Sequence, residues 1–539
     1  MPRRKAKAAK KSRKSEILVY LALSLIVLYT IAYSLAFAIG PSHMGDDIAY
    51  SYLAYYSSQG TFKQTIGDIL SVRILHIMPI SFFYRILGYG ILSSMAWDMI
   101  SFVFSVILVF LIGREMYDEY VGLLAAFLLS LFPLVAVYST TMSDNIPMMF
   151  LVCLAVFALI KAMKKNSRTW YFFAGIVIVA PPLAIPEGFI LWIIIGLYLL
   201  IEIFRRKVSI NRTTLFFLYG FILAISCLFI FNYISSGYPF ITFTSNILYY
   251  GQTSRPDLIP LPTNVALNFY PHVMFPYNLI QTLESWIKYK KLNITGTAES
   301  YLSGANSTGI YFYVLVIAAA YLIWKRDRRL YLPMFWLVIG ILYLGFGPQH
   351  IGLSPFTYVL SHRLDRYLTL VAAPLVIIIS ASIITFIRSS RRKPWKFARA
   401  TISVALLAVL CITSMQIIMF LHQIAKAEQY TQLSAAEYLN KLPNSTRIYS
   451  DSGWGDIAIY MHFDNIGRFY YGYGGISTCI GIPSGSYVLM PRYMQNGLSS
   501  CTSNWQLVLS PQPNNFPQTA VSLATPDITD LYYVPKNAT

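Results

Sequence analysis

Repeated apolar stretches, each long enough to cross a bilayer, constrain this chain more than any other feature. A transmembrane helix needs roughly 20 consecutive, mostly apolar residues, and the sequence contains about eleven such stretches. Lipid cannot hydrogen-bond to exposed backbone groups, so these apolar stretches predict a bundle of helices. We place them at 17–38, 90–112, 120–138, 145–160, 170–185, 188–204, 213–233, 309–324, 331–346, 367–387 and 401–421.

The composition supports this prediction. The 539 residues are 56% hydrophobic and 12% charged, whereas soluble domains contain about 25% charged residues. We therefore expect an all-α polytopic membrane protein.

The net charge of +19 would suggest a nucleic-acid partner only if the basic residues shared one surface. Instead, Lys and Arg cluster before the first span and in alternate connections between spans, as in KAMKKNSR, WKRDRR and RSSRRKPWKFAR. Such clusters mark the cytoplasmic segments of membrane proteins. We expect a cytoplasmic N-terminus, contacts with membrane lipids and no nucleic acid.

Alternation of the spans divides the chain into three parts. Residues 1–16 form a basic cytoplasmic tail, 17–421 a transmembrane domain with external loops 39–89 and 234–308, and 422–539 an external domain. The last part is about the size of one small domain. Its segments TRIYS, SYVLMPRY, WQLVLS and LYYVP predict strands, and AEQYTQLSAAEYLNKL predicts a helix before them. We expect a small α/β domain there.

The cysteines fall into two groups. Cys153, Cys227 and Cys411 lie within predicted spans, where we expect them to pack in the core. Cys479 and Cys501 lie in the external domain. External compartments permit disulfides, so either a pair or two free thiols is consistent with the sequence.

Acidic residues at the external ends of the spans are the most informative polar residues. Asp46 and Asp47 follow the first span, Asp144 opens the fourth, and Glu187 lies at the turn between the fifth and sixth. Ionisable residues at the membrane edge are expensive and mark functional sites by default. The alternative is that each acid caps a helix N-terminus, but a cap needs only one acid of the Asp-Asp pair.

Basic residues occur at the same predicted depth. Arg73 and His76 lie in GDILSVRILHIMPISFFYRILG, which predicts a helix along the membrane surface. His362, Arg363 and Arg366 open the tenth span. The alternatives are the polar face of a surface helix for the first group and lipid-headgroup anchoring for the second. Convergence of acids and bases from distant segments favours an active site.

Together these side chains suit transfer from a lipid-linked phosphate donor. A carboxylate can accept the proton of an attacking hydroxyl group. Arginine can stabilise a phosphate leaving group through paired hydrogen bonds. Apolar walls below the polar residues would surround the lipid tail of the donor.

Residues 44–165 resemble the protein O-mannosyltransferase and aminoarabinose (lipid A) transferase families of the glycosyltransferase C superfamily. The resemblance lies in the acid pair, in LHIMPISFFYRILG and in GREMYDEYVGLLAAFLLSLFPLVAVYSTTMSDNIPMMF. Farther along, HRLDRYLTLVAAPLVIII is similar to their late Arg-Tyr…Pro helix. The chain departs from the families in having Asp-Asp where many relatives have Asp-Glu. It also has only Met78-Pro79 where they have Lys-Pro-Pro or His-Pro-Pro.

The resemblance implies an inverting transferase that uses a polyprenyl (dolichyl) phosphate-linked sugar on the outer or lumenal face. The acceptor would be a protein, a lipid or a glycan. By position, Asp46 or Asp47 would be the base and Asp144 a second carboxylate. A divalent metal, Mg²⁺ or Mn²⁺, is a further expectation, with Asp46 and Asp144 as its ligands.

The resemblance also implies roles for the basic residues. Arg73 or His76 would meet the donor phosphate, and Arg363 and Arg366 would add further phosphate contacts. Glu187 and His362 would contact substrate.

Other functions remain open at this point. An oligosaccharyltransferase-like enzyme acting on Asn would need an Asp-x-Asp in the first loop and a Trp-Trp-Asp-Tyr-Gly motif, and the chain contains neither. A transporter or flippase would show inverted repeats and polar residues at mid-span. A sugar-binding scaffold that kept the fold is distinguished only by activity.

Overall fold

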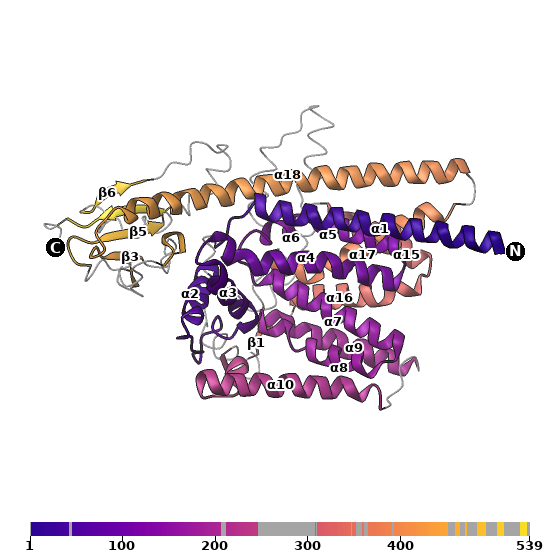
Figure 1. Cartoon of the computed structure of the whole chain (residues 1–539), viewed down its shortest axis with the longest axis horizontal. Helices are drawn as coiled ribbons and strands as arrows, with labels where there is room; N and C mark the ends of the chain where they lie inside the picture. The colour runs from indigo at the N-terminus through magenta and orange to yellow at the C-terminus, as the bar shows by residue number, and fades with distance from the viewer. Residues whose placement is uncertain are drawn as a thin grey trace.

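Long helices run roughly side by side through most of the computed structural model, and a small β-sheet lies beyond one end of them (Figure 1). The bundle is formed by α1 (Pro2–Ala36), α4 (Ile91–Met116), α5 (Glu119–Ser130), α6 (Pro133–Tyr138), α7 (Asn145–Lys165), α8 (Arg168–Val177), α9 (Ile190–Phe204), α10 (Leu215–Ser236), α15 (Tyr311–Trp324), α16 (Tyr331–Phe346), α17 (Thr369–Arg388) and α18 (Lys393–Asn440). The structure describes residues 2–41, 46–205, 212–245, 308, 310–346, 348–351, 358–360, 365–390, 393–450, 459–463, 469–471, 482–491, 504–510 and 529–535.

Shorter elements connect these helices. Two of them, α2 (Asp46–Ser58) and α3 (Ile74–Leu87), lie at the end of the bundle that faces the sheet, opposite the N-terminus of the chain (Figure 1). The 3-10 helices are η1 (Pro181–Leu183), η2 (Pro186–Phe189), η4 (Arg328–Leu330), η5 (Asp365–Leu368) and η6 (Ile459–Met461), and β1 (Pro348–Ile351) pairs with β2 (Tyr358–Leu360).

Every predicted span coincides with helical structure. Among the described residues, seven helices are long and apolar enough to cross a membrane. Others are interrupted by proline, which cannot donate a backbone hydrogen bond. Thus the predicted span 120–138 is divided into α5 and α6 at Pro133, and 170–185 passes from α8 into η1 at Pro181. The prediction of an all-α membrane fold is confirmed.

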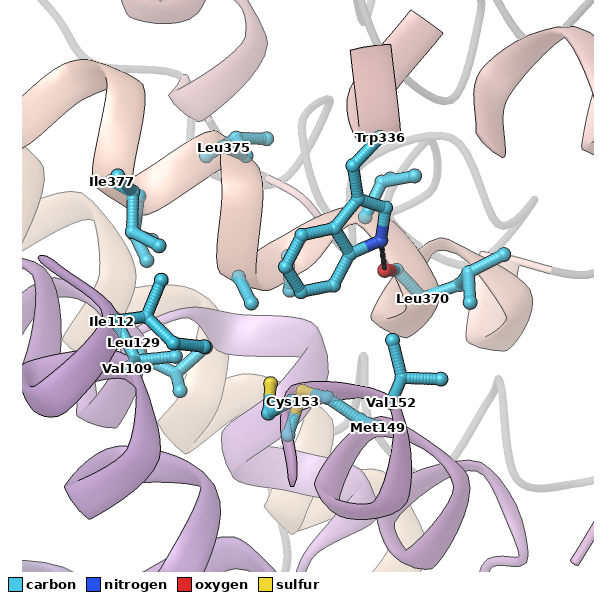
Figure 2. Close-up of a cluster of buried hydrophobic side chains, with 14 of the residues drawn as sticks. Val109, Ile112, Leu129, Met149, Val152, Cys153, Trp336, Leu370, Leu375 and Ile377 are labelled. Carbon is cyan, nitrogen blue, oxygen red and sulfur yellow. Dashed lines mark hydrogen bonds between the residues drawn. The ribbon is translucent and has the colours of Figure 1, made fainter. Parts of the chain in front are cut away.

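Helix α17 lies at the centre of the apolar core. Ile377 is directed toward Ile112 of α4 and Leu129 of α5, and Trp336 of α16 lies beside Leu370 in the first turn of α17 (Figure 2). Pro374 has no N–H to bond with the Leu370 carbonyl one turn earlier. The indole N–H of Trp336 donates to that carbonyl at 3.1 Å instead. A buried polar atom that proline would leave unpaired is thereby satisfied.

The C-terminal part begins with an unexpected continuity. The predicted last span and the predicted helix of the external domain form one 48-residue helix, α18. It leads to a five-stranded sheet in the order β4-β3-β5-β7-β6. The strands are β3 (Ile448–Ser450), β4 (Phe469–Tyr471), β5 (Tyr487–Pro491), β6 (Gln506–Leu509) and β7 (Thr529–Tyr533). The predicted α/β domain is confirmed, although β4 was not among the predicted strands.

Helices α8 and α10 approach each other closely because each has a glycine at the contact. A Cβ atom added at Gly175 would lie 2.0 Å from the Phe217 carbonyl oxygen, and one added at Gly220 would lie 2.0 Å from that of Phe172. Small residues permit such backbone contact between membrane helices. The packing of α8 on α10 therefore depends on the absence of both side chains.

We predict that Gly175→Ala or Gly220→Ala separates α8 from α10 and destabilises the protein by about 1–3 kcal/mol, the usual range for overpacking. Thermal unfolding in lipid nanodiscs measures the effect as a lower Tm. Gly196→Ala in α9 is the matched control, because no atom lies within 4 Å of its added Cβ. Equal Tm values for all three variants would contradict the prediction.

Candidate active site

The acid pair forms the first turn of α2. A helix N-terminus favours negative charge in its first turn through the aligned peptide dipoles. Asp47 is buried, with 5% of the residue exposed, whereas the side chain of Asp46 is 35% exposed. Tyr50 follows one turn later, on the face of α2 that carries both acids. This face is directed into the protein, since Tyr50 is only 1% exposed.

The segment before α7 lies against the end of the first span. The backbone N–H groups of Ile39 and Gly40 both donate to the Thr140 carbonyl, at 2.9 and 3.1 Å. Ser143 donates its N–H to the Asp98 carboxylate of α4 at 3.1 Å. These bonds fix the residues on both sides of Thr141, and they place Asp144 beside α2.

Asp144 does not cap α7 with its side chain. Its carboxylate instead accepts a hydrogen bond from the Tyr50 hydroxyl at 2.6 Å and forms an ion pair with Arg73. The amide of Asn145 donates to its other oxygen at 2.9 Å. Asp144 thus occupies the N-cap position of α7 without a capping bond from its side chain, which belongs to a buried polar network.

Burial and charge act in opposite directions on this network. Burial raises the pKa of Asp144, but the guanidinium groups of Arg73 and Arg366 outweigh it and leave that pKa below its ordinary value. The pKa of Tyr50 is raised well above 10, mainly by burial. At neutral pH the network therefore contains an ionised Asp144 and a neutral Tyr50.

A second ion pair joins the beginning of the chain to its late helices. Arg366, in η5 just before α17, donates to the Asp46 carboxylate at 3.1 Å. The Arg366 side chain is 14% exposed, and its Nε has no hydrogen-bond partner among the described residues. This pair therefore lies at the accessible edge of the polar network, while Arg73 and Asp144 lie in its interior.

Glu187 approaches the network from a third direction. It lies in η2, where Gly188 packs so closely on Pro181 that an added Cβ would lie 2.4 Å from the Pro181 carbonyl carbon. Glu187 is 7% exposed, and its Oε2 has no hydrogen-bond partner among the described residues. Its charge interacts with those of Arg73, Asp144 and Arg366.

His76 is the least satisfied polar residue of the group. It is completely buried in α3, and neither ring nitrogen has a hydrogen-bond partner in the described part of the chain. The Tyr50 ring meets it edge-on, with 4.6 Å between ring centroids. Burial lowers the pKa of His76 from 6.5 to about 4, and Asp144 only partly offsets this effect. The imidazole is therefore neutral at pH 7.

The structure thus brings together most of the residues that the sequence indicated. Those that converge are Asp46, Asp47, Arg73, His76, Asp144, Glu187 and Arg366. His362 and Arg363 lie outside the described residues.

The sequence analysis missed two participants, Tyr50 and Asp98. The position of Tyr50 one helical turn after the acid pair was the available signal. Asp98 interacts electrostatically with Asp47 and Asp144. Its position as an acid inside the predicted span 90–112 was the available signal.

These residues do not fit a resident metal ion at Asp46 and Asp144. Arg366 bonds to the first carboxylate and Arg73 to the second, so each is already beside a cation. Within the ranges that the structure describes, no group of three or more His, Cys, Asp or Glu side chains is arranged to hold a metal. Dependence on Mg²⁺ or Mn²⁺ stays a prediction from the resemblance.

Comparison with a family model supports the inferred resemblance. Residues 74–231 match the model described as dolichyl-phosphate-mannose-protein mannosyltransferase, which covers less than a third of the chain. No curated protein sequence matches significantly. The matched region begins at Ile74, immediately after Arg73, and contains His76, Asp144 and Glu187.

Solved structures resemble most of the chain. The apo oligosaccharyltransferase of Archaeoglobus fulgidus has a TM-score of 0.55 at 12% identity, covering 88% of this chain and 70% of that one. ArnT from Cupriavidus metallidurans bound to undecaprenyl phosphate has a TM-score of 0.52 at 10% identity, with coverage of 96% and 98%. Apo ArnT gives 0.53 at 11% identity, with coverage of 98% and 99%. The chain therefore has the glycosyltransferase C fold.

The neutral, buried His76 predicts a pH-dependent stability. Its folded pKa of about 4 lies below the ordinary value of 6.5, so the unfolded chain binds the proton at higher pH. Stability should be complete above pH 6.5, fall by about 3 kcal/mol as the pH drops to 4, and level off below. Chemical unfolding of wild type and His76→Gln at pH 7.5 and 4.5 measures this. The variant should lose less stability between the two values, and an equal loss would contradict the prediction.

Proposed function

We propose that this chain is a membrane glycosyltransferase that moves a sugar from a polyprenyl-phosphate carrier to an acceptor hydroxyl group of a protein, lipid or glycan. The observation that supports it best is the Asp46–Arg366 pair at the accessible edge of a buried network. In this proposal Asp46 acts as the general base and Arg366, beside it, as the phosphate ligand. The family model and the fold of the solved structures point to the same class of reaction.

Asp46 is the better placed of the two neighbouring acids to act as the base. Its side chain is 35% exposed, whereas Asp47 is buried near the carboxyl group of Asp98. In the proposed step Asp46 takes the proton of the acceptor hydroxyl as its oxygen attacks the anomeric carbon. The bond from that carbon to the phosphate oxygen breaks, and the electron pair remains on the polyprenyl phosphate. Displacement from the opposite face inverts the anomeric configuration.

Arg366 is the described cation best suited to the leaving phosphate. Its Nε has no hydrogen-bond partner among the described residues, and a guanidinium group can donate two parallel hydrogen bonds to a phosphate. Arg73 is already engaged by Asp144 and Tyr50. We assign Arg73 the role of holding Asp144 in place. The neutral imidazole of His76 would contribute an N–H donor rather than a positive charge.

An apolar groove next to the network would accommodate the prenyl chain of the donor. Its volume is about 440 Å³. Its walls come from α3, from the end of α8 through η1, and from α10: Ile74, Ile176, Val179, Ala180, Leu183, Leu223, Ala224, Cys227, Leu228 and Phe231. Ile74 directly follows Arg73, so the groove begins one residue from the charged network. One solved structure with this fold, ArnT, is described as bound to undecaprenyl phosphate, and a prenyl chain is the occupant we propose here.

The proposed reaction predicts carboxylate-dependent loss of sugar from the carrier. Purified protein in lipid would receive radiolabelled polyprenyl-phosphate mannose and, separately, a hexose and a pentose carrier. Asp46→Asn should lower kcat at least about 100-fold, the lower limit usual for a general base. Asp47→Asn should have a smaller effect, because Asp47 is buried.

Asp68→Asn is the matched control in the same external loop. Asp68 accepts the Leu70 N–H at 2.9 Å, and asparagine can keep that bond, so turnover should match wild type. Absence of turnover with every carrier, or turnover indifferent to Asp46, would overturn the catalytic assignment. Movement of the intact carrier between leaflets without transfer would favour a flippase.

Cys227 provides a test of the groove. We expected this residue in the core, but it is exposed on α10 and lies in the groove wall. Undecaprenyl phosphate should slow maleimide labelling of Cys227 about tenfold at a concentration 10 times its Kd, because only the free fraction reacts. Peptide mass spectrometry identifies the labelled residue. Cys411 on α18 is the internal control, and inorganic phosphate is the ligand control. Equal labelling of Cys227 with and without the lipid would exclude the groove as its site.

A further inference from the structure

A short segment of the C-terminal domain inserts into the first external loop. This segment, residues 459–463, includes η6 and ends at Phe463, which is 4% exposed. Its ring is surrounded by four tyrosines of the loop 39–89. The ring-centroid distances are 4.5 Å to Tyr55 in a stacked arrangement, 5.4 Å to Tyr52, 5.5 Å to Tyr89 and 6.2 Å to Tyr84.

Two hydrogen bonds fix the same segment to both ends of the loop. His462 donates from Nδ1 to the Tyr89 carbonyl at 2.6 Å. Tyr460 donates its hydroxyl proton to the Pro41 carbonyl at 2.9 Å. Pro41 follows the first span, and Tyr89 precedes α4. The segment therefore links the residues at which the loop leaves and re-enters the bundle.

The backbone of the segment is held in an unfavourable conformation. His462 and Phe463 have φ angles of 54° and 56°, in the left-handed region that residues with a Cβ rarely occupy. Such a conformation persists only where the surrounding contacts determine it, and it often occurs at functional sites. Here the contacts that determine it are the aromatic rings and the Tyr89 carbonyl.

Phe463 contacts the two helices that carry the polar network. Tyr52 and Tyr55 belong to α2, whose first residues are Asp46 and Asp47. Tyr84 belongs to α3, which contains His76. The C-terminal domain is connected to the same region along α18 as well, because Gln429 donates to the Ile39 carbonyl. The sheet and both helices lie at one end of the molecule (Figure 1).

We propose that His462 and Phe463 are positioning residues, through which the C-terminal domain holds α2 and α3 in the arrangement that the reaction needs. Neither residue touches the polar network itself, and both act through the tyrosines of the loop. The activity part of this proposal rests on the proposed function. The structural part, order in α2 imposed by the C-terminal domain, is independent of it.

The first test is hydrogen exchange on the full chain in nanodiscs. Phe463→Ala should increase the exchange rate of the α2 and α3 amides about tenfold, while α7 stays protected as in wild type. Phe463→Tyr, which keeps the ring, should restore the wild-type rate. Tyr470→Ala is the matched control, since Tyr470 stacks on Tyr449 within the sheet. Unchanged exchange in α2 for Phe463→Ala would overturn the proposal.

The second test separates positioning from folding. Phe463→Ala should lower kcat about 10- to 100-fold, the cost of small misplacements in an active site, with donor KM within about twofold of wild type. His462→Asn should retain more activity than His462→Ala, because asparagine tolerates the left-handed conformation and keeps an N–H donor. A change in KM alone would overturn the positioning role. If wild type transfers no sugar, the proposed function fails, and the exchange experiment alone decides on this inference.

Discussion

The buried ion pair between Arg73 and Asp144 is the interaction on which the arrangement of the site depends. Arg73 is the residue before α3, and Asp144 is the residue before α7. Tyr50 bonds to Asp144 and so adds α2. Taking two charges out of water costs several kcal/mol for each ion, so such a pair is weak evidence for stability. Removing either partner, however, would leave an uncompensated buried charge. Because separating the two side chains is therefore costly, the pair keeps the segments before α3 and α7 together.

This pair also determines which groups are left for chemistry. Because Arg73 and Asp144 pair with each other in the interior, Asp46 and Arg366 are the more accessible charges among the described residues of the network. In the proposed reaction, a donor phosphate would meet there a guanidinium group that has already lost part of its hydration, and hydrogen bonds to it would be stronger in such surroundings than in water. The neutral His76 and the Oε2 of Glu187, neither of which has a hydrogen-bond partner in the part of the chain that the structure describes, are further polar groups that the proposed substrate would satisfy.

The sequence predicted the convergence of the site better than its internal contacts. Alternating spans were sufficient to place Asp46, Asp144, Glu187 and Arg366 at one end of a bundle, because each follows or precedes an apolar stretch of known length. The same argument could not show that the Asp144 side chain bonds to Tyr50 and Arg73 instead of capping α7. An aspartate that caps a helix and one that forms an ion pair can occupy the same position in the sequence. It also could not show that α18 continues unbroken into the C-terminal domain. The apolar span 401–421 and the more polar segment AEQYTQLSAAEYLNKL were interpreted as two helices because the sequence changes from apolar to polar between them. Cys227 was misplaced because an apolar span has no sequence mark that distinguishes its outer face from its inner one.

The position of the polar network relative to the groove bears on the choice between an enzyme and a transporter. A transporter needs polar groups near the middle of the membrane that are exposed to each side in turn. Here the charged residues lie where the spans end on one side, and the apolar groove begins directly beside Arg73, at Ile74. That geometry lets a phosphate headgroup react at the membrane edge while its prenyl chain stays in apolar surroundings. Because a prenyl chain gains about 0.8 kcal/mol for each CH₂ kept out of water, a site that never requires the chain to leave lipid suits group transfer better than transport.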